Sequence, residues 1–153
     1  MKPLLFLAAL AALLAGYVAY AADLPYSETA DAKADVRLAL SQARTKPVLL
    51  IFGANWCEDC RALDRALKTG RNASLIAREF KVVKIDVGNF DRNLDVAGSY
   101  GNPIAKGISA AVILSPGNKV LYSTRAGELS NARRMNEEGI YRFFKKAIEN
   151  ATR

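Results

Sequence analysis

Residues 47–60 read Pro-Val-Leu-Leu-Ile-Phe-Gly-Ala-Asn-Trp-Cys-Glu-Asp-Cys, an apolar run followed by two cysteines three residues apart. The run 47–53 has no charged or polar side chain, which is typical of a strand that is buried on both faces. Residues 57–68 follow with the periodicity of an amphipathic helix, which places Leu63 on its inward face and Asp64 on its outward face. The sequence therefore predicts that Cys57 and Cys60 lie where a buried strand gives way to a helix.

The spacing of the two cysteines predicts their chemistry. Residues three apart at the start of a helix lie on one face, so both sulfurs can reach disulfide distance. Cys57 would stand beside free backbone N–H groups at the positive helix end, which favours its thiolate. Cys60 would lie one turn deeper and be shielded. We therefore expect Cys57 to attack, or be attacked, and Cys60 to resolve the mixed disulfide.

Counts of two residue types limit the alternatives. The chain has two Cys and no His, which excludes Ser-His or Cys-His hydrolysis and imidazole metal sites. A zinc site needs four ligands, and neither a His nor a third Cys is present. A two-thiolate copper(I) site and an inert structural disulfide both remain open. A four-residue ring closes almost no loop and stabilises little, so redox chemistry is the leading interpretation.

Alternating apolar and polar segments predict the rest of the fold. A mixed four-stranded sheet flanked by helices on both faces is expected, because strand, helix and strand imply a parallel pair, and a late hairpin adds antiparallel pairing. The expected strands are 47–53, 81–86, 110–114 and 119–124, and the expected helices are 27–44, 57–68, 72–80, 92–100 and 137–150.

The N-terminus predicts export. Residues 1–21 have one charged residue, Lys2, then an apolar run that ends in the small-x-small pattern Ala19-Tyr20-Ala21, as in a signal peptide. The folded domain would then span 22–153, in the periplasm or otherwise exported. The membrane is a partner only if the segment stays attached as an anchor, for which it is long enough. Basic residues are dispersed despite a net charge of +7, so no nucleic-acid partner is expected.

Residues 52–60 resemble the active-site segment of the thioredoxin-like family, in which an apolar strand leads through Ala-x-Trp into Cys-x-x-Cys. Residues 84–86 and 107–121 resemble the strand after its first crossover and its late hairpin. The resemblance covers most of residues 30–150 and implies a thioredoxin fold. It is closest to exported members described as disulfide isomerases or reductases. It also implies that the loop at Ile108-Ser109 faces the substrate and that Trp56 is the family's Trp beside the nucleophile. Trp56 either packs on the helix start or also forms part of the surface on which partners dock, for which an exposed aromatic beside a reactive Cys is well placed.

The chain departs from the family pattern at two positions. Thioredoxins carry a buried Asp in the strand before the motif, and Ile51 stands there in this chain. Proton relay would then fall to water, Glu58 or Asp59, and these two carboxylates would also raise the pKa of Cys57 by repelling its thiolate. Ser109 stands at the family's cis-proline, with Pro103 as an alternative match. Its hydroxyl is expected near the sulfurs, with the peptide bond cis or trans.

The expected function is that of an enzyme that reduces or isomerises disulfides of exported proteins through Cys57 and Cys60. It would use no cofactor or metal, and a thiol donor would re-reduce it. A reductase with a narrow set of client proteins, a copper(I)-handling module and a redox-inert binding domain are the alternatives. The only methionines, Met1 and Met135, stand far from the Cys pair in sequence, which counts against copper.

Overall fold

A computed structural model of the chain describes residues 24–153. The predicted signal peptide, residues 1–21, lies outside the described residues. Within 24–153, no helix combines the length and the hydropathy that crossing a membrane would require.

The fold is built on a mixed four-stranded sheet in the order β2-β1-β3-β4. The strands are β1 (Val48–Gly53), β2 (Lys81–Asp86), β3 (Ala110–Leu114) and β4 (Val120–Ser123). β1 runs parallel to β2 and antiparallel to β3, and β3 pairs antiparallel with β4. Every residue of β1 is buried, as its apolar run predicts. The predicted topology is confirmed.

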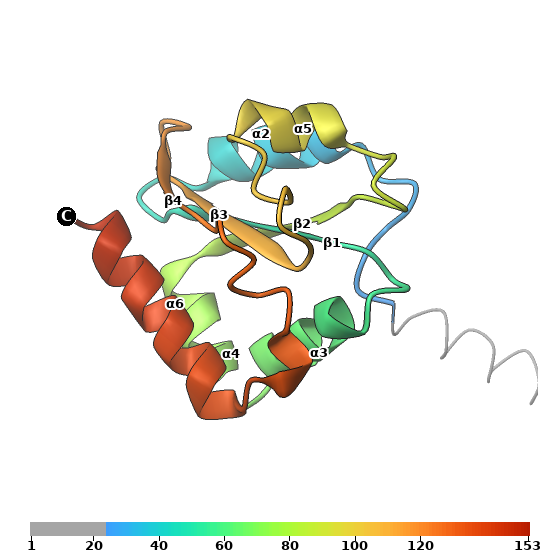
Figure 1. Cartoon of the computed structure of the whole chain (residues 1–153). Coiled ribbons are helices and arrows are strands. Elements are labelled where there is room, and N and C mark those ends of the chain that lie inside the picture. The colour runs from blue at the N-terminus through green and yellow to red at the C-terminus, as the bar shows by residue number, and fades with distance from the viewer. Residues whose placement is uncertain (1–23) are drawn as a thin grey trace, which may run out of the picture.

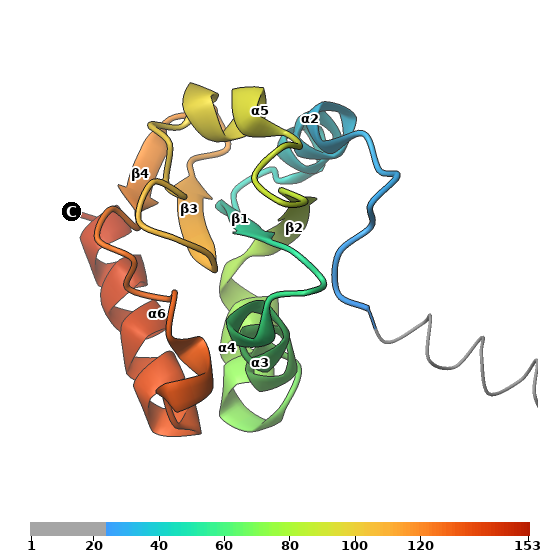
Figure 2. The same ribbon diagram turned by 45° about the vertical axis from the view of Figure 1, so that its right-hand side comes forward.

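Helices cover both faces of this sheet, as Figure 1 shows. On one face lie α2 (Ala32–Gln42) and α5 (Leu94–Ser99); on the other lie α3 (Glu58–Leu67), α4 (Gly70–Glu79) and α6 (Glu137–Ala151). The same layering appears when the molecule is turned, with α6 lying beside α3 and α4 (Figure 2). Two apolar cores result, one on each side of the sheet, and side chains of β1 contribute to both.

Several element boundaries differ from the predictions. α2 begins at Ala32 rather than near Ser27, because the Asp31 carboxylate caps it by accepting the backbone N–H of Ala34 at 3.0 Å. α4 begins at Gly70, two residues before the predicted start. A 3₁₀ turn, η1 (Ala132–Arg134), was not predicted.

The prediction that Asp64 faces solvent is wrong. Asp64 is only 7% exposed and accepts charge-assisted hydrogen bonds from the ammonium groups of Lys84 and, at 2.7 Å, Lys68. Lys84 lies on β2 beside Ile51 of β1, so a basic side chain from the sheet meets this face of α3. A buried charge is stable only when it is paired in this way.

Candidate active site

Cys57 and Cys60 lie where β1 ends and α3 begins, and they form a disulfide with Cα atoms 5.2 Å apart. Cys57 is the N-cap of α3, with extended backbone, and its Sγ accepts the backbone N–H of Cys60 at 3.1 Å. Cys57 is 5% exposed and Cys60 is fully buried. The predicted difference in depth is therefore present, and the outer sulfur is the one at the positive helix end.

Cys57 opens into a hollow of about 480 Å³, which we name the cysteine hollow. Its walls come from four separate parts of the chain: the start of α3, the loop after β2, the loop before β3 and the segment around η1. The residues that line it are Trp56, Cys57, Glu58, Asp59, Phe90, Gly107, Ile108, Ser130 and Arg133. Cys60 does not line it, so a partner entering the hollow meets Cys57 first.

The loop before β3 brings backbone close to the sulfurs. Gly107 has a φ of +111°, a conformation that favours glycine, and the Ile108–Ser109 peptide bond is cis. The Ile108 carbonyl oxygen lies 3.9 Å from Cys57 Sγ. Ser109 follows it in the chain, but its side chain is fully buried, does not line the hollow and makes no hydrogen bond to any described residue.

Two aromatic side chains form the outer rim of the cysteine hollow. The Trp56 indole N–H donates to the Gly88 carbonyl oxygen at 2.8 Å, yet 55% of the residue is exposed. Phe90 lies beside it, with ring centroids 6.3 Å apart, and is 43% exposed. Phe90 also holds a φ of +62°, which is unusual for a bulky residue. Apart from its place in the loop after a strand, nothing in the sequence marks Phe90 as part of the site.

The two carboxylates between the cysteines are both paired with one arginine. Glu58 accepts a charge-assisted hydrogen bond from the Arg133 guanidinium. Asp59 accepts the backbone N–H of Arg133 at 3.0 Å, and its Oδ1 lies 3.8 Å from the Arg133 Nε. Nothing in the sequence places Arg133 beside the Cys pair, because the contact depends on how η1 packs on α3.

The residues just before the Cys pair are tied to the N-terminal segment. The Asn55 side chain accepts the backbone N–H of Tyr26 at 3.0 Å and donates to the Tyr26 carbonyl oxygen at 2.8 Å. The Tyr26 ring packs against Gly53, where any Cβ would overlap it. Burial of Tyr26 and, secondarily, the charge of Asp86 raise the pKa of its phenol well above the usual value. The contacts of Tyr26 with Asn55 and Gly53 hold the turn from β1 into α3.

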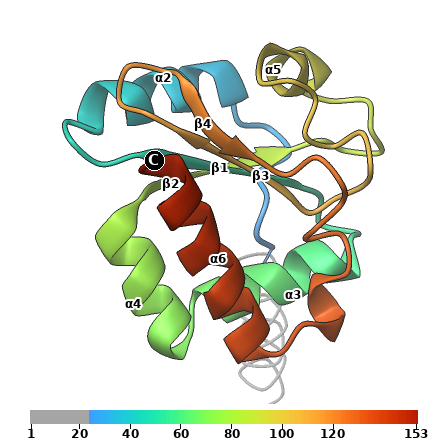
Figure 3. The same cartoon turned by 60° about the vertical axis from the view of Figure 1, so that its left-hand side comes forward.

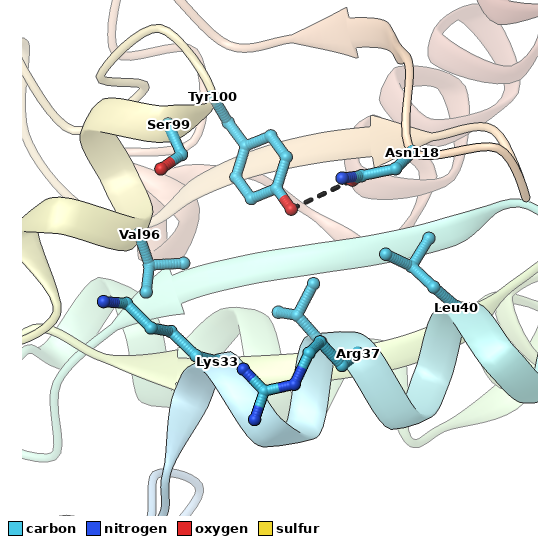
Figure 4. Close-up of a pocket in the computed structure, with 8 residues that line it drawn as sticks. Lys33, Arg37, Leu40, Val96, Ser99, Tyr100 and Asn118 are labelled. Atoms are coloured by element: carbon cyan, nitrogen blue, oxygen red, sulfur yellow. Dashed lines mark hydrogen bonds between the residues drawn. The ribbon is translucent and has the colours of Figure 1, made fainter.

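Other parts of the described chain offer less chemistry. Among residues 24–153, no three His, Cys, Asp or Glu side chains gather as a metal site would require. A second hollow, of about 200 Å³, lies between α2 and α5 (Figure 4). Its polar groups are largely occupied: Lys33 pairs with Asp95 at 2.5 Å, and the Tyr100 hydroxyl bonds the Asn118 side-chain oxygen at 3.0 Å. Among the described residues, it is lined by no cysteine.

Comparisons with known proteins agree with this fold. Residues 29–116 match a family model described as thioredoxin-like. A crystal structure of a disulphide isomerase from Xylella fastidiosa Temecula1 is 55% identical, with a TM-score of 0.80, and the match covers 82% of this chain and 97% of that one. The oxidised C-terminal domain of Neisseria meningitidis DsbD, at 23% identity and a TM-score of 0.50 over 64% of this chain and 83% of that one, shares the fold.

A curated relative is similar over a shorter stretch. The thiol:disulfide interchange protein DsbD of Campylobacter jejuni strain RM1221 is 37% identical over 46 residues, which are 30% of this chain. The match spans 8% of the length of that relative.

Proposed function

Because the chain belongs to the thioredoxin-like family and is a thiol–disulfide oxidoreductase with a Cys57–Cys60 pair, we propose that it reduces or isomerises disulfides of exported proteins. Cys57 is the attacking sulfur and Cys60 the resolving sulfur. The observation that carries this assignment is the asymmetry of the pair. Cys57 lines the cysteine hollow and accepts an N–H at the helix start, whereas Cys60 is fully buried behind it.

In the reducing direction the reaction has two exchanges. The Cys57 thiolate attacks one sulfur of a client disulfide, forms a mixed disulfide and expels the other client sulfur as a thiolate, which takes up a proton. Cys60 then loses its proton and attacks Cys57 Sγ, which releases the second client thiolate and closes the Cys57–Cys60 disulfide. The client gains two electrons and two protons. In isomerisation, the released client thiolate instead attacks a second client disulfide and frees a different client thiolate. That thiolate attacks the client sulfur bonded to Cys57, which forms a new client disulfide and releases the Cys57 thiolate.

The backbone N–H of Cys60 supports the first exchange. It lies 3.1 Å from Cys57 Sγ, and a hydrogen bond to a charged acceptor is about twice as strong as a neutral one. The same N–H therefore favours the thiolate over the thiol, which lowers the pKa of Cys57. The carboxylates of Glu58 and Asp59 act in the opposite direction, and they stay the residues that we expect to tune this pKa.

Client proteins would dock on the rim of the cysteine hollow. Trp56 and Phe90 present exposed aromatic surface, and Ile108 presents a backbone carbonyl oxygen close to Cys57. Aromatic rings bury much apolar area with little loss of conformational entropy, which suits a surface that must accept many sequences. Ser109 is buried in this loop and would act on the sulfurs only through its hydroxyl.

Reduction of insulin by dithiothreitol, followed by the turbidity of the freed chains, tests the proposal. The wild-type protein should accelerate precipitation, Cys57→Ser should not, and Cys60→Ser should stall after one exchange. Full activity in Cys57→Ser would overturn the roles, and an inactive wild-type protein would favour the copper-handling or redox-inert alternatives.

Export and re-reduction complete the proposal. Removal of residues 1–21 would release a domain that begins at Ala22, and a thiol donor outside the cytoplasm would return the disulfide to the dithiol. The intact mass of protein purified from the periplasm tests the first point. A mass that includes residues 1–21 would identify a retained anchor instead.

A further inference from the structure

Arg133 joins two parts of the chain that are far apart in sequence. The turn η1, which contains Arg133, packs against α3, and Figure 3 shows it as the orange-red turn next to α3. This packing places Arg133 beside the first turn of α3. Asp59 accepts the Arg133 backbone N–H at 3.0 Å, so the position of this arginine is fixed by its backbone as well as by its side chain. The guanidinium then meets Glu58 and lies 3.8 Å from Asp59.

These contacts lie inside the cysteine hollow. Arg133, Glu58, Asp59 and Cys57 all line it, so the three charged residues border the space in which the Cys57 thiolate forms. The Asp59 side chain is only 16% exposed, so water screens its charge less than at an open surface. Two negative charges beside a thiolate oppose its formation, and a positive charge paired with both of them offsets that effect.

We propose that Arg133 is a positioning residue for the redox centre: it holds and neutralises Glu58 and Asp59 and thereby stabilises the Cys57 thiolate. This inference rests on the proposed function of Cys57 as the attacking sulfur. The proposal also predicts in which direction Arg133 shifts the redox equilibrium of the Cys pair. Stabilising the thiolate stabilises the reduced protein, so Arg133 shifts the equilibrium between protein disulfide and two molecules of glutathione toward protein dithiol and glutathione disulfide.

The test measures the acid dissociation constant of Cys57 from thiolate absorbance at 240 nm, in a Cys60→Ser background where Cys57 is the only thiol. Arg133→Gln should lower that constant by about threefold to tenfold, the range expected for one partly screened charge. Arg133→Lys should restore part of the loss, because it keeps the charge but not the forked contact with both carboxylates.

Arg134→Gln is the matched control, since it removes the same charge one residue away and Arg134 forms no ion pair among residues 24–153. It should leave the dissociation constant of Cys57 unchanged. The difference between Arg133→Gln and wild type should also shrink in 1 M salt, where the Debye length falls to about 3 Å. A melting temperature for each variant identifies any loss of folding.

An independent measurement uses both cysteines. Equilibration with glutathione above the pKa of Cys57 should show the disulfide of Arg133→Gln favoured by the same factor, and a tenfold change corresponds to 29.6 mV. An unchanged dissociation constant in a folded Arg133→Gln variant, or an equal change in Arg134→Gln, would overturn the inference while leaving insulin reduction intact. If the wild-type protein does not reduce insulin, the proposed function itself would be overturned.

Discussion

Replacing Phe90 with Asn tests whether clients dock beside Cys57. Phe90 is 43% exposed, and an aromatic side chain buries about 200 Å², so about 90 Å² of it is free for a client to cover. If docking covers half of that area, about 45 Å² at 25 cal/mol per Å² gives about 1 kcal/mol, or roughly a fivefold change in rate. Asn tolerates the φ of +62° better than Phe, so the substitution relieves the backbone while it removes the ring.

The assay compares two substrates. Phe90→Asn should slow the reaction of the dithiol protein with insulin about fivefold and leave its reaction with a small aromatic disulfide unchanged. Its free energy of unfolding should stay within about 1 kcal/mol of wild type. Leu38→Asn, which truncates a 55% exposed side chain on α2, should change neither rate. An equal slowing with both substrates would show that the ring acts on Cys57 itself, and no slowing with insulin would refute docking at Phe90.

Three further predictions concern buried polar groups. The raised pKa of Tyr26 means that its phenol stays protonated above pH 10 in the folded protein, whereas it ionises there in the unfolded chain. The stabilising effect of its burial is therefore full below pH 10 and is lost as the pH rises. In urea unfolding, Tyr26→Phe should reduce this loss by up to about 1.4 kcal/mol per pH unit. Asp64→Asn leaves the ammonium of Lys84 without its buried counter-charge and should lower the free energy of unfolding by roughly 2 kcal/mol, whereas no change would mean that solvent already satisfies Lys84. Ser109→Ala removes a buried hydroxyl that forms no hydrogen bond with a described residue, so the free energy of unfolding should not fall. If this hydroxyl donates a hydrogen bond to the thiolate in the reduced protein, Ser109→Ala should raise the pKa of Cys57. An unchanged pKa of Cys57 would exclude Ser109 from the site.

The core of the fold was predictable because its elements carry strong local signals. The unbroken apolar run in β1 and the short strand 110–114 are buried throughout, and β2 begins and ends where predicted. The position of the Cys pair at the strand–helix junction was predictable for the same reason, because the sequence patterns of the strand and of the helix that flank it are both clear. The start of α2 was misplaced because several residues before Ala32 are good caps, and only the structure selects Asp31.

Contacts between distant parts of the chain were not predictable. Asp64 has the spacing of an exposed helix position, and it is buried because Lys84 of β2 reaches across to it. Arg133 lies beside Asp59 although 74 residues separate them, and Tyr26 meets Asn55 across 29. Such pairings depend on how the elements pack, and neither hydrophobic periodicity nor local residue preference predicts them.

Capture of a client on a single cysteine distinguishes the attacking sulfur from the resolving sulfur. Dithiol-reduced Cys60→Ser protein, freed of reductant and mixed with a disulfide-containing peptide, should form a stable mixed disulfide, and peptide mapping by mass spectrometry should place the peptide on Cys57. Cys57→Ser treated in the same way should form little adduct, because Cys60 is fully buried. Rapid adduct formation on Cys60 in Cys57→Ser, with none on Cys57 in Cys60→Ser, would contradict the assignment of Cys57 as the attacking sulfur.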